Sequence, residues 1–300
     1  MHKVDRESLK EKMGMYTWYH TIEVADGIYT ESFVPNFKKM WDHNLKCMEG
    51  VDFTDKKVLD IGCRDGLFSF EAEKRGAREI IGIDNDISKG AVEFLIPFFN
   101  SKVKMYEASL YDLNTLKFGT FDIILFFGVL YHLRYPFWGL KKVIESLSDN
   151  GLLLIESGML ITQKLKDKEI LYCPVENSPY NEPTSCTFFN KEGLGVTMDS
   201  LGCRLLEFWT LDENDVEHKK KMTKAQYVIQ TLKMSTTFCR SKIKNLFFGN
   251  ICDDWQIKRQ FYIFKKEPEK RNYRGMNTNV MSEYWNGTHK IHSKKSIIYK

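Results

Sequence analysis

The sequence predicts an α/β fold, in which helices cover a mostly parallel sheet. Two observations carry this prediction. An apolar run over 58–61 leads into a glycine turn over 62–66 and then into a helical stretch over 67–72, the strand–turn–helix order of nucleotide-binding units. A second apolar strand over 79–84 follows and ends in Asp84. An acidic side chain at the tip of the second strand hydrogen-bonds ribose hydroxyls in such folds.

The glycine turn is a candidate ligand site. Gly62 and Gly66 allow the backbone to approach a ligand closely, and the free N–H groups at the start of the following helix face it. The G-x-x-x-G spacing alone is common. The main alternative is a dinucleotide-binding dehydrogenase, which normally carries G-x-G-x-x-G. Arg64 stands where the second glycine of that motif would fall.

The first fifty residues precede the predicted sheet. We expect a short amphipathic helix over 6–15, a hairpin over 18–30 with its turn at Asp26-Gly27, and a helix over 37–48. Active sites of open α/β sheets lie beyond the carboxyl ends of the strands. Residues 1–50 are therefore predicted to form a lid over the cofactor. The alternative is that their aromatic side chains only pack onto the sheet.

Helices and strands continue to alternate after the second strand. The sequence predicts a helix over 87–99, a strand over 103–107, a central strand over 121–127, a helix over 138–148 and a fifth strand over 151–156. The fourth strand of the predicted sheet, over 121–127, is apolar from residue 123 onward, as expected for a strand at the centre of the sheet.

The second half of the chain is less regular. Residues 157–200 are predicted to form a long loop with one short helix, 203–211 the sixth strand and 259–265 the seventh. The expected organisation is an N-terminal lid or helical segment (1–50), an α/β core (51–211), a basic helical insertion between the last two strands (212–258), the last core strand (259–268) and a C-terminal tail (269–300).

Composition places the protein among soluble, cytoplasmic proteins. A chain of 300 residues with 43% hydrophobic residues can bury one large α/β domain with additions. The charged N-terminus does not resemble a signal peptide, and no apolar run approaches the roughly 18 to 20 residues of a membrane span. Seven cysteines without a C-x-x-C pair indicate reduced thiols and argue against zinc, and no other metal site is predicted.

Charge is unevenly distributed along the chain. Residues 1–211 hold 25 basic and 31 acidic side chains, whereas residues 212–300 hold 19 basic and 9 acidic ones. This excess predicts that the C-terminal part meets an anion, such as a nucleic acid, a nucleotide sugar or a membrane surface. The alternative is a solvated basic tail. The sequence does not indicate an oligomeric state.

The stretch Val58-Leu59-Asp60-Ile61-Gly62-Cys63-x-x-Gly66 and the later Gly82-Ile83-Asp84 resemble the first two motifs of class I S-adenosylmethionine (SAM) methyltransferases. The resemblance implies a Rossmann-like seven-stranded sheet whose last two strands pair antiparallel. It also implies SAM as cofactor and S-adenosylhomocysteine as product. The cofactor-binding residues would be Asp60, Gly62, Cys63, Gly66, Asp84, Leu110, Tyr111, Phe127 and Tyr131.

The residues after the central strand are the candidate catalytic residues. In a class I methyltransferase this strand tip lies at the sulfonium end of the cofactor, which points to Tyr131 and His132. Methyl transfer depends mainly on in-line alignment and on exclusion of water. A hydroxyl or ring-nitrogen acceptor also benefits from a base, which His132 could supply near neutral pH. Alternatively, His132 caps the following helix or hydrogen-bonds the backbone. Tyr131 is expected to shape the sulfonium pocket.

The pattern Gly128-Val129-Leu130-Tyr131-His132-x-x-x-Pro136 also resembles, more narrowly, the bacterial tRNA wobble-uridine (cmo5U34) carboxymethyl-transfer enzymes and their methyltransferase relatives. Those tRNA enzymes hold carboxy-SAM with basic residues, including a lysine in the N-terminal segment. Here that region reads Trp18-Tyr19-His20-Thr21. A missing cation opposite a buried carboxylate costs several kcal/mol, so we expect SAM rather than carboxy-SAM. The candidate substrate-binding residues are Tyr19, His20, Tyr180 and Arg259.

Three functions remain open at the level of sequence. The favoured one is a SAM-dependent methyltransferase that modifies a hydroxyl or nitrogen of a small, anionic acceptor such as a sugar, a nucleotide sugar or a metabolite. The alternative is a tRNA wobble-uridine methyl- or carboxymethyltransferase, which a steep salt dependence of tRNA binding would favour. A protein that binds SAM without turnover is the third, and the intact glycine turn and Asp84 argue against it.

Overall fold

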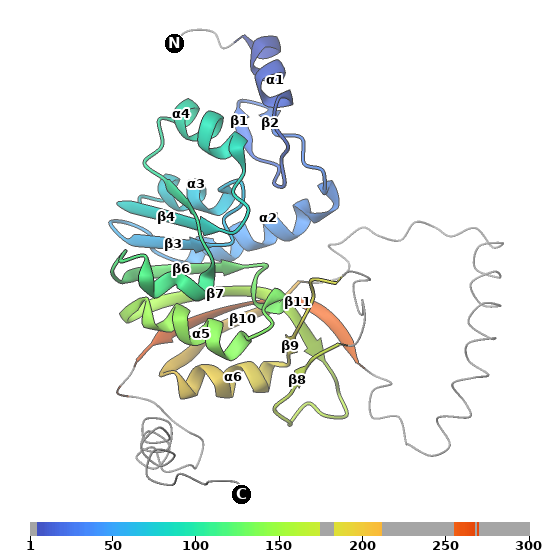
Figure 1. Ribbon diagram of the computed structural model, residues 1–300. Coiled ribbons are helices and arrows are strands. Elements are labelled where there is room, and N and C mark those ends of the chain that lie inside the picture. The colour runs from blue at the N-terminus through green and yellow to red at the C-terminus, as the bar shows by residue number, and fades with distance from the viewer. Residues whose placement is uncertain (1–4, 175–182, 212–254, 268, 270–300) are drawn as a thin grey trace, which may run out of the picture.

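Seven strands form one sheet in the spatial order β10-β11-β7-β6-β3-β4-β5 (Figure 1). The computed structural model describes residues 5–174, 183–211, 255–267 and 269. The five strands from β7 to β5 are parallel, and β10 and β11 are antiparallel to their neighbours. The strand bounds are β3 Lys57–Ile61, β4 Glu79–Asp84, β5 Lys104–Glu107, β6 Phe121–Phe127, β7 Leu147–Ile161, β10 Cys203–Thr210 and β11 Gln256–Lys266.

Helices cover both faces of this sheet. In β6, Ile124 and Phe126 join a core cluster with α5 and α6, whereas Ile123 and Leu125 join a second cluster with α2 and α3. Burial on both faces explains why the sequence of β6 is apolar without alternation. The helix bounds are α1 Arg6–Gly14, η1 Pro35–Phe37, α2 Lys38–Cys47, η2 Met48–Gly50, α3 Leu67–Lys74, η3 Ala91–Leu95 (a π-helix), α4 Ile96–Phe99, η4 Leu110–Thr115, η5 Leu130–His132, α5 Pro136–Glu145 and α6 Lys191–Ser200.

The predicted seven-stranded sheet with its antiparallel last pair is confirmed, but several bounds are wrong. β7 does not end at residue 156. It continues to Ile161 because β11 pairs with it in an antiparallel ladder from Gln256↔Ile161 to Lys265↔Leu152. Part of the predicted long loop is therefore sheet. The same ladder starts the last strand at Gln256 rather than at residue 259, so the predicted insertion is shorter than expected at its C-terminal end.

α5 also differs from its prediction. It begins at Pro136, which occupies the first helical position, and ends at Glu145. Proline fits that position because its fixed φ suits the helix and its missing N–H is not needed there. Strand β7 then begins at Leu147, inside the range that the sequence assigns to the helix. The short helix predicted within 157–200 is α6, which Asn190 caps by accepting the N–H of Gly193.

The N-terminal segment forms the predicted helix, hairpin and second helix. The hairpin pairs β1 (Glu23–Ala25) with β2 (Ile28–Tyr29), and Gly27 in its turn has φ +67°. A second two-stranded sheet pairs β8 (Leu171–Tyr172) with β9 (Phe188–Phe189). Trp18 packs so closely on Gly90 that a Cβ there would lie 2.4 Å from the indole. The N-terminal segment is thus fixed against the loop after β4.

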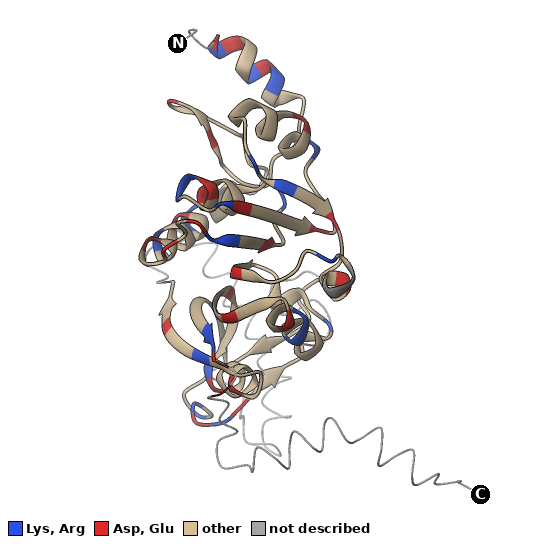
Figure 2. Ribbon diagram, turned by 90° about the vertical axis from the view of Figure 1, so that its left-hand side faces the viewer, with Lys and Arg blue, Asp and Glu red and all other residues tan. Residues whose placement is uncertain are grey.

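Acidic and basic residues are interspersed over these elements, for example along α1 at the top of Figure 2. The basic excess predicted for the C-terminal part, like most of the predicted insertion and tail, falls mainly on residues outside the described ranges. Within those ranges, no helix is both long and apolar enough to cross a membrane.

Candidate active site

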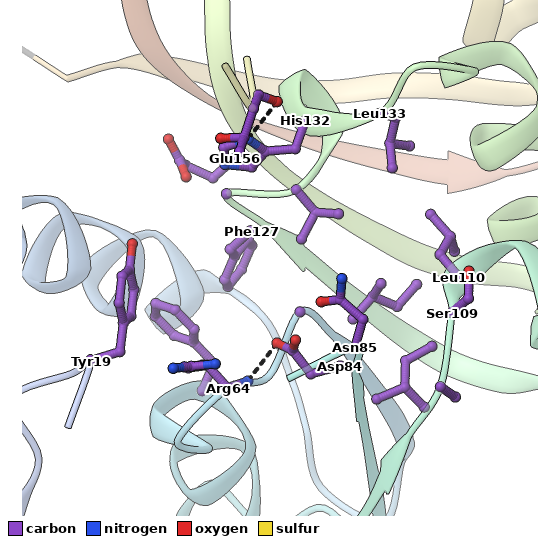
Figure 3. A pocket seen from close by; sticks show the side chains of 18 of the residues that line it. Tyr19, Arg64, Asp84, Asn85, Ser109, Leu110, Phe127, His132, Leu133 and Glu156 are labelled. Atoms are coloured by element: carbon purple, nitrogen blue, oxygen red, sulfur yellow. Dashed lines mark hydrogen bonds between the residues drawn. The ribbon is translucent and has the colours of Figure 1, made fainter. Parts of the chain in front are cut away.

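A cavity of about 830 Å³ opens at the carboxyl ends of β3, β4, β6 and β7. Its walls come from the strand tips, from the loop after β5 and from the N-terminal segment (Figure 3). Asp84 and Asn85 lie at one end of this cavity, and Tyr19, His132 and Glu156 lie toward the other. We call these the Asp84 end and the Glu156 end.

The glycine turn after β3 is held by close packing. Gly62 has φ +78°, lines the cavity, and donates its N–H to the carbonyl of Ile83 at 2.8 Å. A Cβ on Gly62 would lie 2.4 Å from Cγ2 of Val129. Gly66 has φ +85°, and a Cβ there would lie 2.3 Å from Cε of Met105. Both positions therefore require glycine for backbone conformation and for space.

Asp84 is the charged group of the Asp84 end. Its Oδ2 accepts the backbone N–H of Arg64 at 2.9 Å, and its Oδ1 accepts that of Asp86 at 2.9 Å (Figure 3). Burial raises the pKa of Asp84 above its ordinary value, and the two backbone hydrogen bonds act in the opposite direction. Each oxygen retains lone-pair capacity, so the carboxylate can accept a pair of vicinal hydroxyls.

Asp60 lies beneath the cavity and does not line it. It is 1% exposed, and its Oδ2 accepts the hydroxyl of Ser69 at 2.6 Å. Burial raises the pKa of Asp60 to about 7. Cys63 is also buried beneath the cavity, and its Sγ fills the space where Gly82 has no side chain. Asp60 and Cys63 support the turn from below, although the sequence predicts them to bind the cofactor.

The residues after β5 form an apolar wall. Ser109 Oγ accepts the N–H of Tyr111 at 3.2 Å and starts η4, which places Leu110 and Tyr111 on the cavity. The hydroxyl of Tyr111 accepts the backbone N–H of Tyr135 at 3.2 Å. This bond ties the wall to the segment after η5. Phe127 lines the floor of the cavity at the tip of β6.

A buried ion pair lies at the Glu156 end. Arg259 of β11 donates from Nε and Nη2 to the two carboxylate oxygens of Glu156 at 2.5 and 2.6 Å. The side chain of Glu156 is 2% exposed and lines the cavity. The Arg259 guanidinium lies 4.7 Å from the ring centroid of Tyr131. Neither Arg259 nor Tyr131 lines the cavity itself, so both lie behind the wall that Glu156 forms.

His132 lines the cavity next to this ion pair. Its Nδ1 lies 3.0 Å from the carbonyl of Thr184 (Figure 3). A carbonyl only accepts, so Nδ1 carries the hydrogen and Nε2 carries the lone pair of the neutral ring. The ring therefore does contact the backbone, the alternative that the sequence left open. The N–H groups of Cys186 and Thr187 both donate to the carbonyl of Tyr131, at 2.8 and 3.1 Å.

The N-terminal segment closes the cavity at the same end. Tyr19 and His20 both line it, and their backbone N–H groups donate to Oδ2 of Asp65 at 2.5 and 2.6 Å. Burial is the main cause that raises the pKa of Tyr19 to about 12, so its hydroxyl stays protonated and can donate. Tyr180, the remaining candidate substrate residue, lies outside the described ranges.

A family model described as a methyltransferase domain matches residues 35–207 of the chain. The chain belongs to this family. The match covers more than half of the sequence and contains the glycine turn, Asp84 and every residue that lines the cavity except Tyr19, His20 and Phe33. The predicted enzyme class, a SAM-dependent methyltransferase, is confirmed by this family match.

The methyltransferase is similar to curated proteins named tRNA U34 carboxymethyltransferase. It is 33% identical over 140 residues to that of Helicobacter acinonychis (strain Sheeba), a match that covers 45% of this chain and 52% of the relative. It is 32% identical over 140 residues to that of Helicobacter pylori (strain G27), with the same coverage. The chain thus spans about half the length of the curated relatives it matches.

Solved structures share the fold of the methyltransferase. The N-terminal domain of EvdMO1, solved in the presence of SAH and D-fucose, aligns with a TM-score of 0.54 at 14% identity, over 89% of this chain and 99% of that one. The O-methyltransferase of a trans-AT PKS multienzyme of Brevibacillus brevis aligns with a TM-score of 0.52 at 16% identity, over 86% and 84%. At these identities the likeness concerns the fold.

The cavity of the methyltransferase fits SAM in its donor set. Asp84 suits the two ribose hydroxyls, and the wall of Leu110 and Tyr111 suits a flat, apolar base. At the other end, the faces of Tyr19 and Phe127 and the carboxylate of Glu156 suit a sulfonium cation. The described residues hold no group of three or more His, Cys, Asp or Glu side chains placed to bind a metal ion.

Two functional candidates were missed by sequence reasoning. Glu156 ends the apolar run of β7, a signal similar to the one that identified Asp84, but its partner Arg259 lies 103 positions later. Asp65 stands within the glycine turn itself and is completely buried. Its partners Tyr19 and His20 precede it by 46 and 45 positions. A carboxylate inside the glycine turn was the available signal for Asp65.

Proposed function

We propose that this methyltransferase modifies a hydroxyl or nitrogen of a small molecule that carries an anionic group, such as a nucleotide sugar. The observation that carries the proposal is the charge-balanced Glu156 end, where Arg259 pairs with both carboxylate oxygens of Glu156 and aromatic side chains line the wall. Such an end suits a compact acceptor. Arg134 is exposed beside the cavity, with no ion pair among the described residues, and is the cation available to the anionic group.

The same ion pair supports SAM over carboxy-SAM. SAM supplies an electrophilic methyl group on a sulfonium, which requires no further charge from the protein. An additional carboxylate on the transferred group would need an unpaired cation. Arg259 is neutralised by Glu156, and Tyr19 and His20 stand where the tRNA enzymes that the sequence resembles carry a lysine. Buried charge without a partner is costly, which favours the uncharged methyl.

The other side chains of the cavity each have a role in this proposal. Asp84 binds hydroxyls at one end and fixes the position of the cofactor. Tyr19, Phe127 and Glu156 line the other end and exclude water from it. His132 lines the same end, with its Nδ1 on the carbonyl of Thr184, and is proposed to hydrogen-bond the acceptor. Tyr131 acts from behind the wall, where it packs on His132 with ring centroids 3.9 Å apart.

Two measurements test this function. Calorimetric titration with SAM and with carboxy-SAM should show tighter binding of SAM, by about tenfold or more. Incubation with radiolabelled SAM and a bacterial extract, separated into small molecules and tRNA, should label the small molecules. Preferential binding of carboxy-SAM, or label in the tRNA fraction alone, would overturn the proposal.

A second candidate function is tRNA wobble-uridine modification. The names of the curated relatives support it. The segment from the cavity residue Tyr135 into α5 supports it as well, because Tyr135 is 67% and Trp138 49% exposed, and the ammonium groups of Lys141 and Lys142 lie 5.6 and 4.9 Å from the Trp138 ring centroid. Exposed aromatic rings beside basic groups stack single-stranded bases. Binding of tRNA that weakens steeply with salt would favour this function.

A further inference from the structure

Asp65 is a buried carboxylate that the proposed function has not used. Its side chain is fully buried, and its Oδ2 accepts the two backbone N–H groups of Tyr19 and His20. Its Oδ1 has no hydrogen-bond partner among the described residues. The nearest group that can become positive is the His20 ring, whose Nδ1 lies 3.6 Å from Oδ2. A carboxylate buried in this way is costly unless a positive or donor group compensates it.

His20 connects this carboxylate to the cavity. The residue is 4% exposed and lines the cavity. Its Nδ1 is buried, makes no hydrogen bond among the described residues, and lies 3.6 Å from Oδ2 of Asp65, an ion-pair distance. The opposite edge of the ring, which carries Nε2, is therefore the part available to the cavity. Rings of Tyr19, Trp41 and Phe68 surround the imidazole, with centroids 4.9, 5.0 and 5.8 Å from it. The ring is thus held in one orientation by packing.

The two histidines of the cavity differ in what lies behind them. His132 is exposed, and its Nδ1 meets a neutral carbonyl. His20 is buried, and its Nδ1 meets a carboxylate. When a histidine takes up a proton, a carboxylate behind the ring stabilises the positive charge and fixes the tautomer, and this effect is larger where water is excluded. His20 is therefore the histidine of this cavity that has a carboxylate behind its ring.

We propose that His20 is the catalytic base of this methyltransferase, with Asp65 as its positioning residue, and that the acceptor group is a hydroxyl. The proposal rests on the proposed function and narrows its acceptor. The acceptor oxygen forms a bond to the methyl carbon, the S–CH3 bond breaks with its electron pair remaining on sulfur, and the hydroxyl proton moves to Nε2 of His20. The imidazolium then returns its proton to water. His132 orients the acceptor.

The class of acceptor follows from this chemistry. A neutral hydroxyl is a weak nucleophile and gains from removal of its proton as the new bond forms. A ring nitrogen with a free lone pair has no proton to lose before attack. A base that is buried and has a carboxylate behind it is therefore matched to an acceptor that carries a hydroxyl. His20 would contact this hydroxyl, and Arg134, which also lines the cavity, would contact the anionic group of the same acceptor.

Kinetics of three variants test the assignment, with radiolabelled SAM and the small-molecule fraction of the extract as the probe. His20→Ala should lower kcat by about a hundredfold or more and leave the Kd for SAM unchanged. Added imidazole should restore part of this turnover. Asp65→Asn should lower kcat by about tenfold or more with little change in KM. His132→Ala, the matched control, should lose less than His20→Ala and should not respond to imidazole.

A second measurement does not depend on turnover. In wild-type protein saturated with S-adenosylhomocysteine, nitrogen-15 spectra of the histidine rings should show His20 with its hydrogen on Nδ1, and Asp65→Asn should disturb this signal. A His20 with its hydrogen on Nε2, full activity of His20→Ala, or a labelled product methylated on nitrogen would each overturn the proposal. If the wild-type protein transfers the radiolabel only to tRNA, the proposed function is wrong. The role of His20 is then decided by whether imidazole restores the activity of His20→Ala with tRNA as the acceptor.

Discussion

The two ends of the cavity hold their carboxylates in different ways. At the Asp84 end, Asp84 is fixed by backbone N–H groups of the adjoining loops, at Arg64 and Asp86. At the Glu156 end, Glu156 and Asp65 are fixed by residues that lie 103 and about 46 positions away in sequence. One end is therefore built by local turns. The other exists only when distant segments have come together, and its charges are paired and buried.

Breaking the buried ion pair should have the largest effect. Arg259→Met leaves Glu156 as an unpaired carboxylate with a side chain only 2% exposed, which should lower the free energy of unfolding by about 3 to 5 kcal/mol. Urea denaturation measures this loss. Adding Glu156→Gln should recover part of the lost free energy of unfolding, because the buried charge is removed.

Lys38→Met is the matched control. The ion pair of Lys38 with Asp42 is half exposed on both sides and should contribute less than about 1 kcal/mol. Equal losses in the two single variants would contradict the buried pairing.

The Asp84 end should respond in binding rather than in folding. Asp84→Asn replaces a charged hydrogen-bond acceptor by a neutral one and should raise the Kd for SAM by about tenfold to a hundredfold, the effect of losing charge-assisted hydrogen bonds. Isothermal titration calorimetry measures it. Glu107→Gln is the control, since Glu107 lies opposite Asp84 on β5 but is exposed and does not line the cavity. An unchanged Kd in Asp84→Asn would place the ribose elsewhere.

Asp60 should make the stability of the protein depend on pH. Its folded-state pKa of about 7 lies above the value of about 4 for an exposed aspartate, so the folded protein binds the proton more tightly than the unfolded chain. This stabilisation is complete below about pH 4 and is lost as the pH rises through about 7. Wild-type protein should therefore lose on the order of 2 kcal/mol between pH 5 and pH 8 through this group.

Asp60→Asn should remove this part of the pH dependence, as urea denaturation at both pH values would show. Asp52→Asn is the control. Asp52 is exposed, and hydrogen bonds from Thr54 lower its pKa, so it stays ionised over the whole range and its replacement should leave the slope unchanged. A slope that persists in Asp60→Asn would mean that another group carries it.

The smallest effect is expected at the apolar wall. Tyr111→Phe removes the acceptor for the N–H of Tyr135, at 3.2 Å. Because the site is partly open to water, the free energy of unfolding should fall by at most about 1 kcal/mol, and SAM should bind slightly more weakly. Thermal unfolding and calorimetry measure the two changes. Tyr106→Phe, on the exposed surface of β5, should change neither; a loss as large as that of Asp84→Asn would assign the hydroxyl a direct role in binding.

The contrast between the two ends also explains what the sequence could predict. Gly62 directly follows the buried strand β3 and Asp84 ends the buried strand β4, so their positions at one edge of the sheet follow from chain order. The Glu156 end depends on pairings between distant residues, and local patterns do not encode such pairings. Asp65 has this character, because its role appears only where the backbone at Tyr19 and His20 reaches it.

The errors in strand length have the same origin. The sequence predicts residues 157–161 as part of a loop that follows the fifth strand. In the structure they remain extended, since β11 supplies hydrogen-bond partners for them, as in the pair Arg259↔Gly158. The hydrophobic pattern of a strand does not reveal an antiparallel partner that lies almost 100 positions away in the sequence. By contrast, β6 is enclosed by neighbours on both sides, and its apolar run predicted its bounds correctly.

The placement of β11 between β7 and β10 has a consequence for synthesis of the protein. A nascent chain that has reached residue 211 already contains the glycine turn and Asp84, but its β10 has no neighbour in the sheet and its Glu156 has no counter-ion. Only when β11 leaves the ribosome can it fill the gap and supply Arg259. The Asp84 end can thus form well before the Glu156 end does. β11, the last strand that the structure describes, completes the site when it emerges.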